Sequence, residues 1–187
     1  MHIYLLCGLL LHKAVWEVMK RRDPAPPQLK SRPRGARLLG LVKVAILAAI
    51  IVQTAFGIAG LPLSNSPGTL RLAGLLLYTA GLLTAVTARI QLGRNWSDIE
   101  KSYVKQDHAL VAYGLYRYVR HPIYAGDVLL LVGLELVLNS WAVAGALAVG
   151  IYVRQQAIRE ERKLLQTLPG YNDYVRRTSR FLPFLPV

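Results

Sequence analysis

Cysteine and acidic residues are both scarce in this chain of 187 residues. The single cysteine, Cys7, excludes an intramolecular disulfide and a metal centre built from several thiolates. The histidines are not spaced like metal ligands and no HEXXH motif is present, so we expect no metal site. Only 10 aspartates and glutamates face 23 lysines and arginines, which gives a formal net charge of +13 at pH 7.

The basic residues gather in three blocks, 20–37, 89–120 and 154–180, that lie between or after apolar segments. This distribution is typical of the cytoplasmic side of a membrane protein, where lysine and arginine also attract anionic lipid headgroups. It argues against nucleic acid as a partner. With all three blocks inside, the N-terminus is expected outside and the C-terminus in the cytoplasm. We expect no cleavable signal peptide, because the basic residues follow the first apolar stretch.

Apolar residues make up 53% of the chain, more than an ordinary soluble domain carries. We therefore expect one all-α integral membrane domain over residues 1–187, with three helices in 1–92 and a cofactor-binding and catalytic half in 93–187. His12, Lys13 and Glu17 interrupt the first apolar segment, so that helix can instead lie on the membrane surface and leave four spans. About five transmembrane helices are predicted, at residues 1–19, 38–61, 70–92, 122–138 and 141–166.

Two features of these segments bear on how the helices pack. Gly74 and Gly81 allow close contact between the third helix and a neighbour. The nearly pure apolar stretch 127–153 is long for one span and short for two. The fourth and fifth helices, separated at Asn139-Ser140, are therefore expected to protrude from the bilayer, and the fifth carries Glu160-Glu161 out of the lipid.

The segment 110–126 combines ionisable and aromatic residues at the mouth of an apolar helix. Such groups are costly at a membrane boundary unless they bind something, so function is expected here. Pro122 suits the first turn of a helix and keeps His121 in the preceding loop, with Tyr124 one turn inside. The free N–H groups of that first turn, with His121 and Tyr124, can hold a carboxylate.

Arg120-His121-Pro122-Ile123-Tyr124, preceded by Gly114-Leu115-Tyr116 and followed by Glu160-Glu161, resembles the signature of the isoprenylcysteine carboxyl methyltransferase and phospholipid methyltransferase superfamily. The resemblance runs from about residue 95 to residue 183. It implies an integral membrane enzyme that uses S-adenosylmethionine without a Rossmann-type domain and releases S-adenosylhomocysteine. An acceptor that is lipidic or embedded in the membrane is implied as well, together with contact to membrane lipids.

The resemblance also implies which residues form the site. Arg120 and Arg177 match positions that pair with an acceptor carboxylate, and Arg180 matches some bacterial and archaeal relatives. Either glutamate of Glu160-Glu161 can accept hydrogen bonds from the cofactor, and Glu161 is the one that matches the family position. The cofactor-binding residues expected are His108, Ala109, Leu110, Val111, Tyr116, His121, Pro122, Ile123, Tyr124, Glu160 and Glu161.

Each of these assignments has a structural alternative. A glutamate pair among arginines usually lies on a solvated helical face, and Tyr113, Tyr116 and Tyr118 can form an interfacial aromatic belt. The chain also lacks the family's substrate arginine near Ala157, which leaves the acceptor open.

We expect methyl transfer to the carboxylate of an isoprenylcysteine-like acceptor, on the cytoplasmic side of a prokaryotic inner membrane. One alternative is a phospholipid or amine N-methyltransferase, which needs a carboxylate or aromatic site for the ammonium. A second, of another class, is a non-enzymatic membrane protein that binds anionic lipid.

Overall fold

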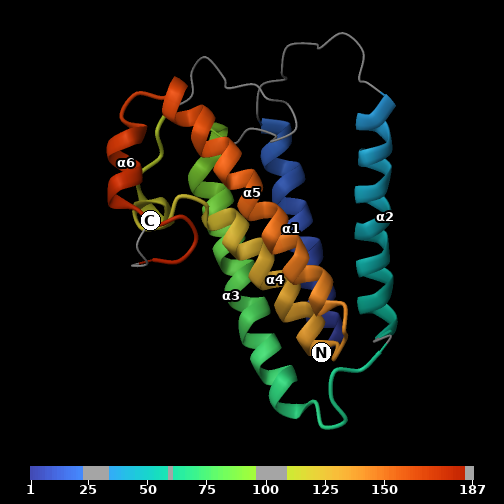
Figure 1. Ribbon diagram of the computed structural model, residues 1–187. Helices are drawn as coiled ribbons and strands as arrows, with labels where there is room; N and C mark the ends of the chain where they lie inside the picture. The colour runs from blue at the N-terminus through green and yellow to red at the C-terminus, as the bar shows by residue number, and fades with distance from the viewer. Residues whose placement is uncertain (23–33, 59–60, 96–108, 184–187) are drawn as a thin grey trace. The chain divides into compact units, whose positions relative to one another are not determined.

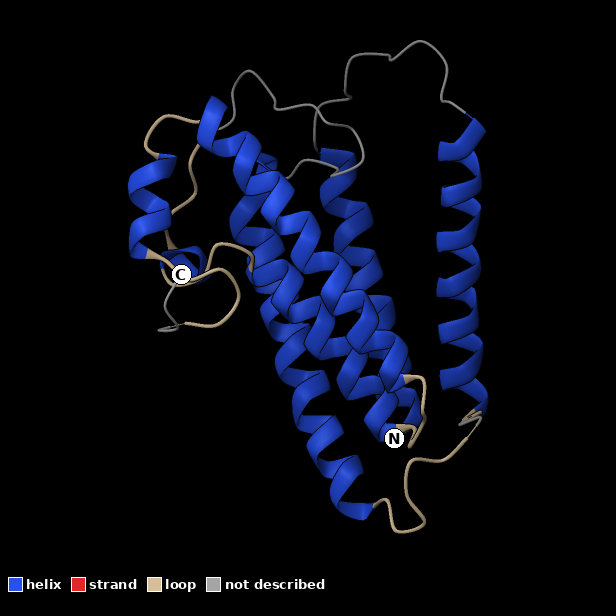
Figure 2. Cartoon of the chain, viewed as in Figure 1, coloured by secondary structure: helices blue, strands red, loops and turns tan. Residues whose placement is uncertain are grey.

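A computed structural model describes residues 1–22, 34–58, 61–95 and 109–183, and every regular element in these ranges is helical (Figures 1 and 2). The all-α class expected from the sequence is confirmed. Backbone pairing outside helices is limited, in the described part of the chain, to two isolated bridges. The elements are α1 (His2–Arg22), α2 (Arg34–Phe56), α3 (Gly68–Leu92), η1 (Gly93–Asn95), η3 (Gly114–Arg117), α4 (Pro122–Val137), α5 (Val143–Thr167) and α6 (Tyr171–Arg177).

The chain divides into two compact units, Met1–Leu61 and Pro62–Val187. In the first unit, the N-terminal end of α1 contacts the C-terminal part of α2, where His2 Nδ1 lies 2.9 Å from the carbonyl oxygen of Thr54. In the second unit, α3 packs with the C-terminal helices, so the third helix groups with the predicted catalytic half and not with the first two helices. That residues 1–187 act as one domain stays a prediction.

Glycines bring the backbones of α3 and α4 into direct contact. A methyl group added at Gly74 would lie 2.8 Å from the carbonyl oxygen of Gly133, and one added at Gly126 would lie 2.6 Å from the amide nitrogen of Ala85. Gly81 meets Leu130 and Gly126 in the same way. Small residues thus line the contact on both helices, as in closely packed membrane helix pairs. The close contact expected at Gly74 and Gly81 is confirmed.

The opposite side of α3 is apolar and exposed. Leu72, Leu76, Leu83 and Ile90 lie near one face of the helix and are each at least half exposed. Among the described helices, α1 and α3 are long and apolar enough to cross a membrane. The number of spans stays a prediction.

The chain reverses between α4 and α5 at Asn139, as the sequence predicted. Asn139 has a left-handed φ of 56°, a conformation that asparagine tolerates better than most residues. Its side chain accepts from the backbone amide of Ser64 at 3.1 Å and donates to the carbonyl oxygen of Ser64 at 2.8 Å. At the other end of α5, Gly170 with a φ of 77° starts α6, a short helix that the sequence had not indicated.

Gly81→Ala should lower the thermal stability of the purified protein in detergent. The added methyl group would lie 2.7 Å from the carbonyl oxygen of Gly126, where only a backbone shift can relieve the clash. Overpacking of this kind costs about 1–3 kcal/mol. Gly145→Ala on α5 is the matched control, because no atom lies within 4 Å of the new methyl group. Equal melting temperatures for the two variants would show that α3 and α4 are not in close contact.

Candidate active site

The C-terminal tail runs beside the loop that precedes α4. The amide of Arg120 donates to the carbonyl oxygen of Ser179 at 2.8 Å, and the amide of His121 donates to that of Arg180 at 3.1 Å. His121 is not helical, and Pro122 begins α4, as the sequence predicted. These backbone bonds bring Arg180 next to Arg120 and His121, although about 60 positions of sequence separate them.

Glu161, on α5, is the common partner of these three side chains. Its Oε1 accepts from Arg120 Nε at 2.9 Å, from His121 Nε2 at 3.1 Å and from Arg180 Nε at 3.1 Å. Its Oε2 accepts from Arg180 Nη2 at 2.9 Å. The Glu161 side chain is 7% exposed and that of Arg120 is fully buried. Burial by itself raises the pKa of Glu161, but the hydrogen bonds from His121, Arg180 and Arg120 together hold it well below its usual range.

Arg120 also fastens α6 to this cluster. Its Nη1 donates to the carbonyl oxygen of Val175 at 3.0 Å and to that of Thr178. Its Nη2 is buried and has no hydrogen-bond partner among the described residues. One guanidinium therefore joins α5, the end of α6 and the tail.

A pocket of about 690 Å³, its open mouth included, lies where the end of α3, the segment 109–124, α5 and α6 meet. Predicted site residues that line it are Ala109, Leu110, Val111, Tyr116, Arg120, His121, Ile123, Tyr124 and Glu160. Lining residues that the sequence analysis missed are Leu92, Asn95, Leu164, Leu168, Tyr171 and Tyr174. The spacing of Tyr171 and Tyr174 by three residues was a signal for a shared helical face.

The two adjacent glutamates occupy different environments. Glu160 lines the pocket and its Oε2 accepts from the Tyr124 hydroxyl at 3.1 Å. Glu161 is not among the lining residues and lies in the cluster with the arginines. Neither has the fully solvated position that a glutamate pair among arginines usually takes. The resemblance pointed to Glu161, whereas the structure puts Glu160 on the cavity.

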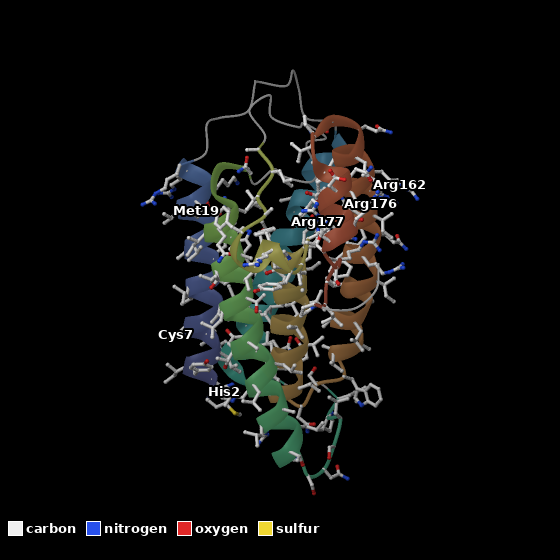
Figure 3. The ribbon with its side chains drawn as sticks, turned by 90° about the vertical axis from the view of Figure 1, so that its left-hand side faces the viewer. His2, Cys7, Met19, Arg162, Arg176 and Arg177 are labelled. Atoms are coloured by element: carbon white, nitrogen blue, oxygen red, sulfur yellow. The ribbon has the colours of Figure 1, made fainter. Side chains whose placement is uncertain are left out.

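The remaining predicted residues lie outside the pocket lining. Arg180, with its side chain 28% exposed, is held by Glu161. Arg177 is exposed on α6, and Figure 3 shows it beside Arg176 and on the same side of the molecule as Arg162. Pro122 is buried at the start of α4. His108 lies outside the described residues.

The tyrosines separate in the same way. Tyr116 is 6% exposed and lines the pocket, and its carbonyl oxygen accepts from the Tyr174 hydroxyl at 2.7 Å. Tyr113 and Tyr118 are 59% and 50% exposed and do not line it. Their exposure matches the belt alternative.

Comparison with known proteins places the chain in a family. Residues 70–170 match the model of the phospholipid methyltransferase family, and this range holds the whole loop–α4 motif and both glutamates. The chain belongs to this family. Its all-helical fold is also similar to that of a solved eukaryotic intramembrane Ras methyltransferase, an isoprenylcysteine carboxyl methyltransferase, with a TM-score of 0.60. That likeness covers 98% of this chain and 67% of the other at 20% sequence identity.

Curated relatives come from bacteria and from eukaryotes. The chain is 34% identical over 112 residues to the cobalt-zinc-cadmium resistance protein CzcN of Cupriavidus metallidurans, covering 59% of this chain and 50% of that protein. It is 30% identical over 115 residues to the protein-S-isoprenylcysteine O-methyltransferase A of Arabidopsis thaliana, covering 60% and 58%. The chain thus spans about half the length of the curated relatives it matches.

Glu161→Gln should destabilise the folded protein strongly. Two guanidinium groups would lose the only carboxylate that the described structure gives them, and removing one partner of a buried pair costs about 3–5 kcal/mol. Glu160→Gln is the matched control, since its carboxylate receives one hydroxyl hydrogen bond in the described cluster. Thermal unfolding in detergent measures both, and similar losses would mean that Glu161 does not hold the tail in place.

The loss should also depend on pH in a defined direction. The folded-state pKa of Glu161 is depressed, so its stabilisation is full above its unfolded pKa of about 4.3. It is lost as the pH falls from there through the folded value. The wild type and Glu161→Gln should therefore converge in stability as the solution is acidified, whereas a constant difference would contradict an ionised Glu161.

Proposed function

We propose that this chain is an integral membrane methyltransferase that uses S-adenosylmethionine and methylates the carboxylate of an isoprenylcysteine-like acceptor. The observation that carries the proposal is the pocket formed by 109–124, α5 and α6, because residues chosen from the family motif line it together. The names of several relatives as isoprenylcysteine O-methyltransferases support the same reaction.

The lining residues fit the parts of the cofactor. S-adenosylmethionine carries an ammonium, a carboxylate, two ribose hydroxyls and an adenine. Glu160 offers an anionic acceptor, Asn95 a neutral amide, and the rings of Tyr116, Tyr171 and Tyr174 offer faces for an aromatic base. The buried Nη2 of Arg120, which has no partner in the described structure, is a donor suited to a carboxylate.

When bound, the cofactor supplies a methyl group on a sulfonium. A carboxylate oxygen that receives it becomes a methyl ester, and no proton has to be removed. The chain's own task is therefore to align the acceptor and to exclude water. Arg180 is the predicted arginine best placed to meet an acceptor carboxylate, being part-exposed beside the pocket residues. Arg177 can meet one only outside the pocket.

An amine acceptor is the second candidate, and one observation favours it. Both arginines near the pocket already bind Glu161, so their positive charge is in part neutralised before an acceptor carboxylate arrives. The pocket itself presents the Glu160 carboxylate, which attracts an ammonium.

We propose that the pocket lies at the cytoplasmic surface of a prokaryotic inner membrane. Exposed apolar residues on α5, such as Leu147 and Ile151, give way to exposed arginines at Arg154 and Arg159. This change marks where a helix passes from hydrocarbon to headgroups. Glu160 follows within about two turns, at 1.5 Å per residue, so a lipidic acceptor can reach the pocket from the bilayer while the cofactor enters from water.

Cofactor binding is tested by calorimetry with S-adenosylhomocysteine on the purified protein. Glu160→Gln should weaken binding by about 1.5–3 kcal/mol, the scale of a hydrogen bond to a charged group. Asp173→Asn is the control, an exposed acid on α6 that does not line the pocket. Absence of binding by the wild type would refute the proposal and favour a non-enzymatic protein that binds anionic lipid.

The acceptor is tested by transfer of a labelled methyl group to a prenylcysteine acid and to an ethanolamine lipid, side by side. With a carboxylate acceptor, Arg180→Lys and Arg180→Ala should both lower ester formation, because lysine keeps the charge but loses the planar fork. Arg176→Ala, an exposed arginine on α6, should leave the rate unchanged. Methylation of the amine alone, at full rate in both Arg180 variants, would establish the second candidate instead.

A further inference from the structure

The hydrogen bond between His121 and Glu161 fixes which ring nitrogen carries the proton. His121 Nε2 lies 3.1 Å from Glu161 Oε1, and an ionised carboxylate can only accept. The hydrogen therefore sits on Nε2. In a neutral imidazole the other nitrogen, Nδ1, is then an acceptor with a free lone pair.

The His121 ring lines the pocket and packs against two other rings. His121 lines the cavity, and its Nδ1 makes no hydrogen bond within the described ranges. The ring stacks on Tyr124, with centroids 5.3 Å apart and planes 4° apart, and Phe181 lies at 5.9 Å. The side chain is only 7% exposed, and a 180° flip of the ring would keep the stacking but move Nε2 away from Glu161.

Two cations and a second acid lie close to the His121–Glu161 pair. Arg120 and Arg180 already donate to the same carboxylate, so the directly bonded set carries two positive charges against one negative before His121 is counted. Glu160, whose carboxylate is bonded to the Tyr124 hydroxyl, is the other acid beside this ring pair.

We propose that Glu161 is a positioning residue that holds His121 in the Nε2–H tautomer, so that Nδ1 accepts a hydrogen bond from the ammonium group of the bound cofactor. The part of this inference that concerns the cofactor, its ligand half, rests on the proposed function. His121 stacks on Tyr124, whose hydroxyl donates a hydrogen bond to Glu160. The Glu160 carboxylate is therefore a second acceptor in the same part of the pocket. An ammonium has three donors and no acceptor, so it suits two such acceptors, whereas the carboxylate first expected at His121 does not.

Nitrogen NMR of the ¹⁵N-histidine-labelled protein tests the tautomer without any ligand, with His121→Gln identifying the resonance. The wild-type ring should be neutral with the proton on Nε2 near neutral pH. Glu161→Gln should shift the population toward Nδ1–H, because the two arginines compete for the single amide oxygen and leave the amide NH₂ to face the ring. Glu160→Gln, which removes no His121 partner, should leave the tautomer unchanged.

An Nδ1–H or doubly protonated ring in the wild type would overturn the inference, and so would a tautomer that Glu161→Gln leaves unchanged. The wild-type spectrum decides even if that variant does not fold, because it needs only the native protein. In that case Arg180→Lys, which keeps the Glu161 carboxylate, should retain Nε2–H.

The ligand half is tested by comparing S-adenosylhomocysteine with an analogue that lacks the amino group. The wild type should prefer the complete ligand by about tenfold, the equivalent of one charge-assisted hydrogen bond. Glu161→Gln should reduce this preference through His121, because Glu161 does not line the pocket. Equal affinities in the wild type would refute the ammonium as the partner. Failure to bind either compound would refute the proposed function and leave the tautomer result standing.

Discussion

The site depends on one buried carboxylate that serves three donors from different parts of the chain. Glu161 comes from α5, Arg120 and His121 from the loop before α4, and Arg180 from the tail. A buried guanidinium without a paired anion is costly, so the carboxylate of Glu161 stabilises the packing of these elements. The same cluster of ion pairs therefore supports the pocket wall and anchors the tail.

The glycine contacts between α3 and α4 set the frame on which this cluster is built. Because Gly81 and Gly126 let the two backbones meet, the C-terminal end of α3 and the N-terminal end of α4 lie side by side. Leu92 at the end of α3, Asn95 in η1 and Tyr124 in α4 thus reach the same cavity. The small residues in this contact bind no ligand themselves, but they determine how close together the polar residues of the site can lie.

Local rules were sufficient for the all-α class and for the start of α4 and the turn after it. Proline at position 122, the break at Asn139 and the glycines of α3 each act through a short stretch of backbone. The choice between Glu160 and Glu161 could not be made in this way. Adjacent helical residues point about 100° apart, and which of them faces the cavity depends on how α5 is rotated against α4 and α6. The position of Arg180 likewise could not be predicted from its neighbours in sequence, because its partner Glu161 lies on α5.

The arrangement of charge explains why one pocket can suit a zwitterionic ligand. On one side, two guanidinium groups share a single carboxylate, so an excess of positive charge lies beside the cavity wall formed by Arg120. On the other, Glu160 and its partner Tyr124 line the cavity with an acceptor. The amino-acid end of S-adenosylmethionine needs both kinds of surface a few ångströms apart. If both glutamates faced the cavity, the arginines would be unpaired and the pocket would favour cations alone. Because Glu161 instead pairs with the arginines outside the lining, the site offers both positive and negative charge.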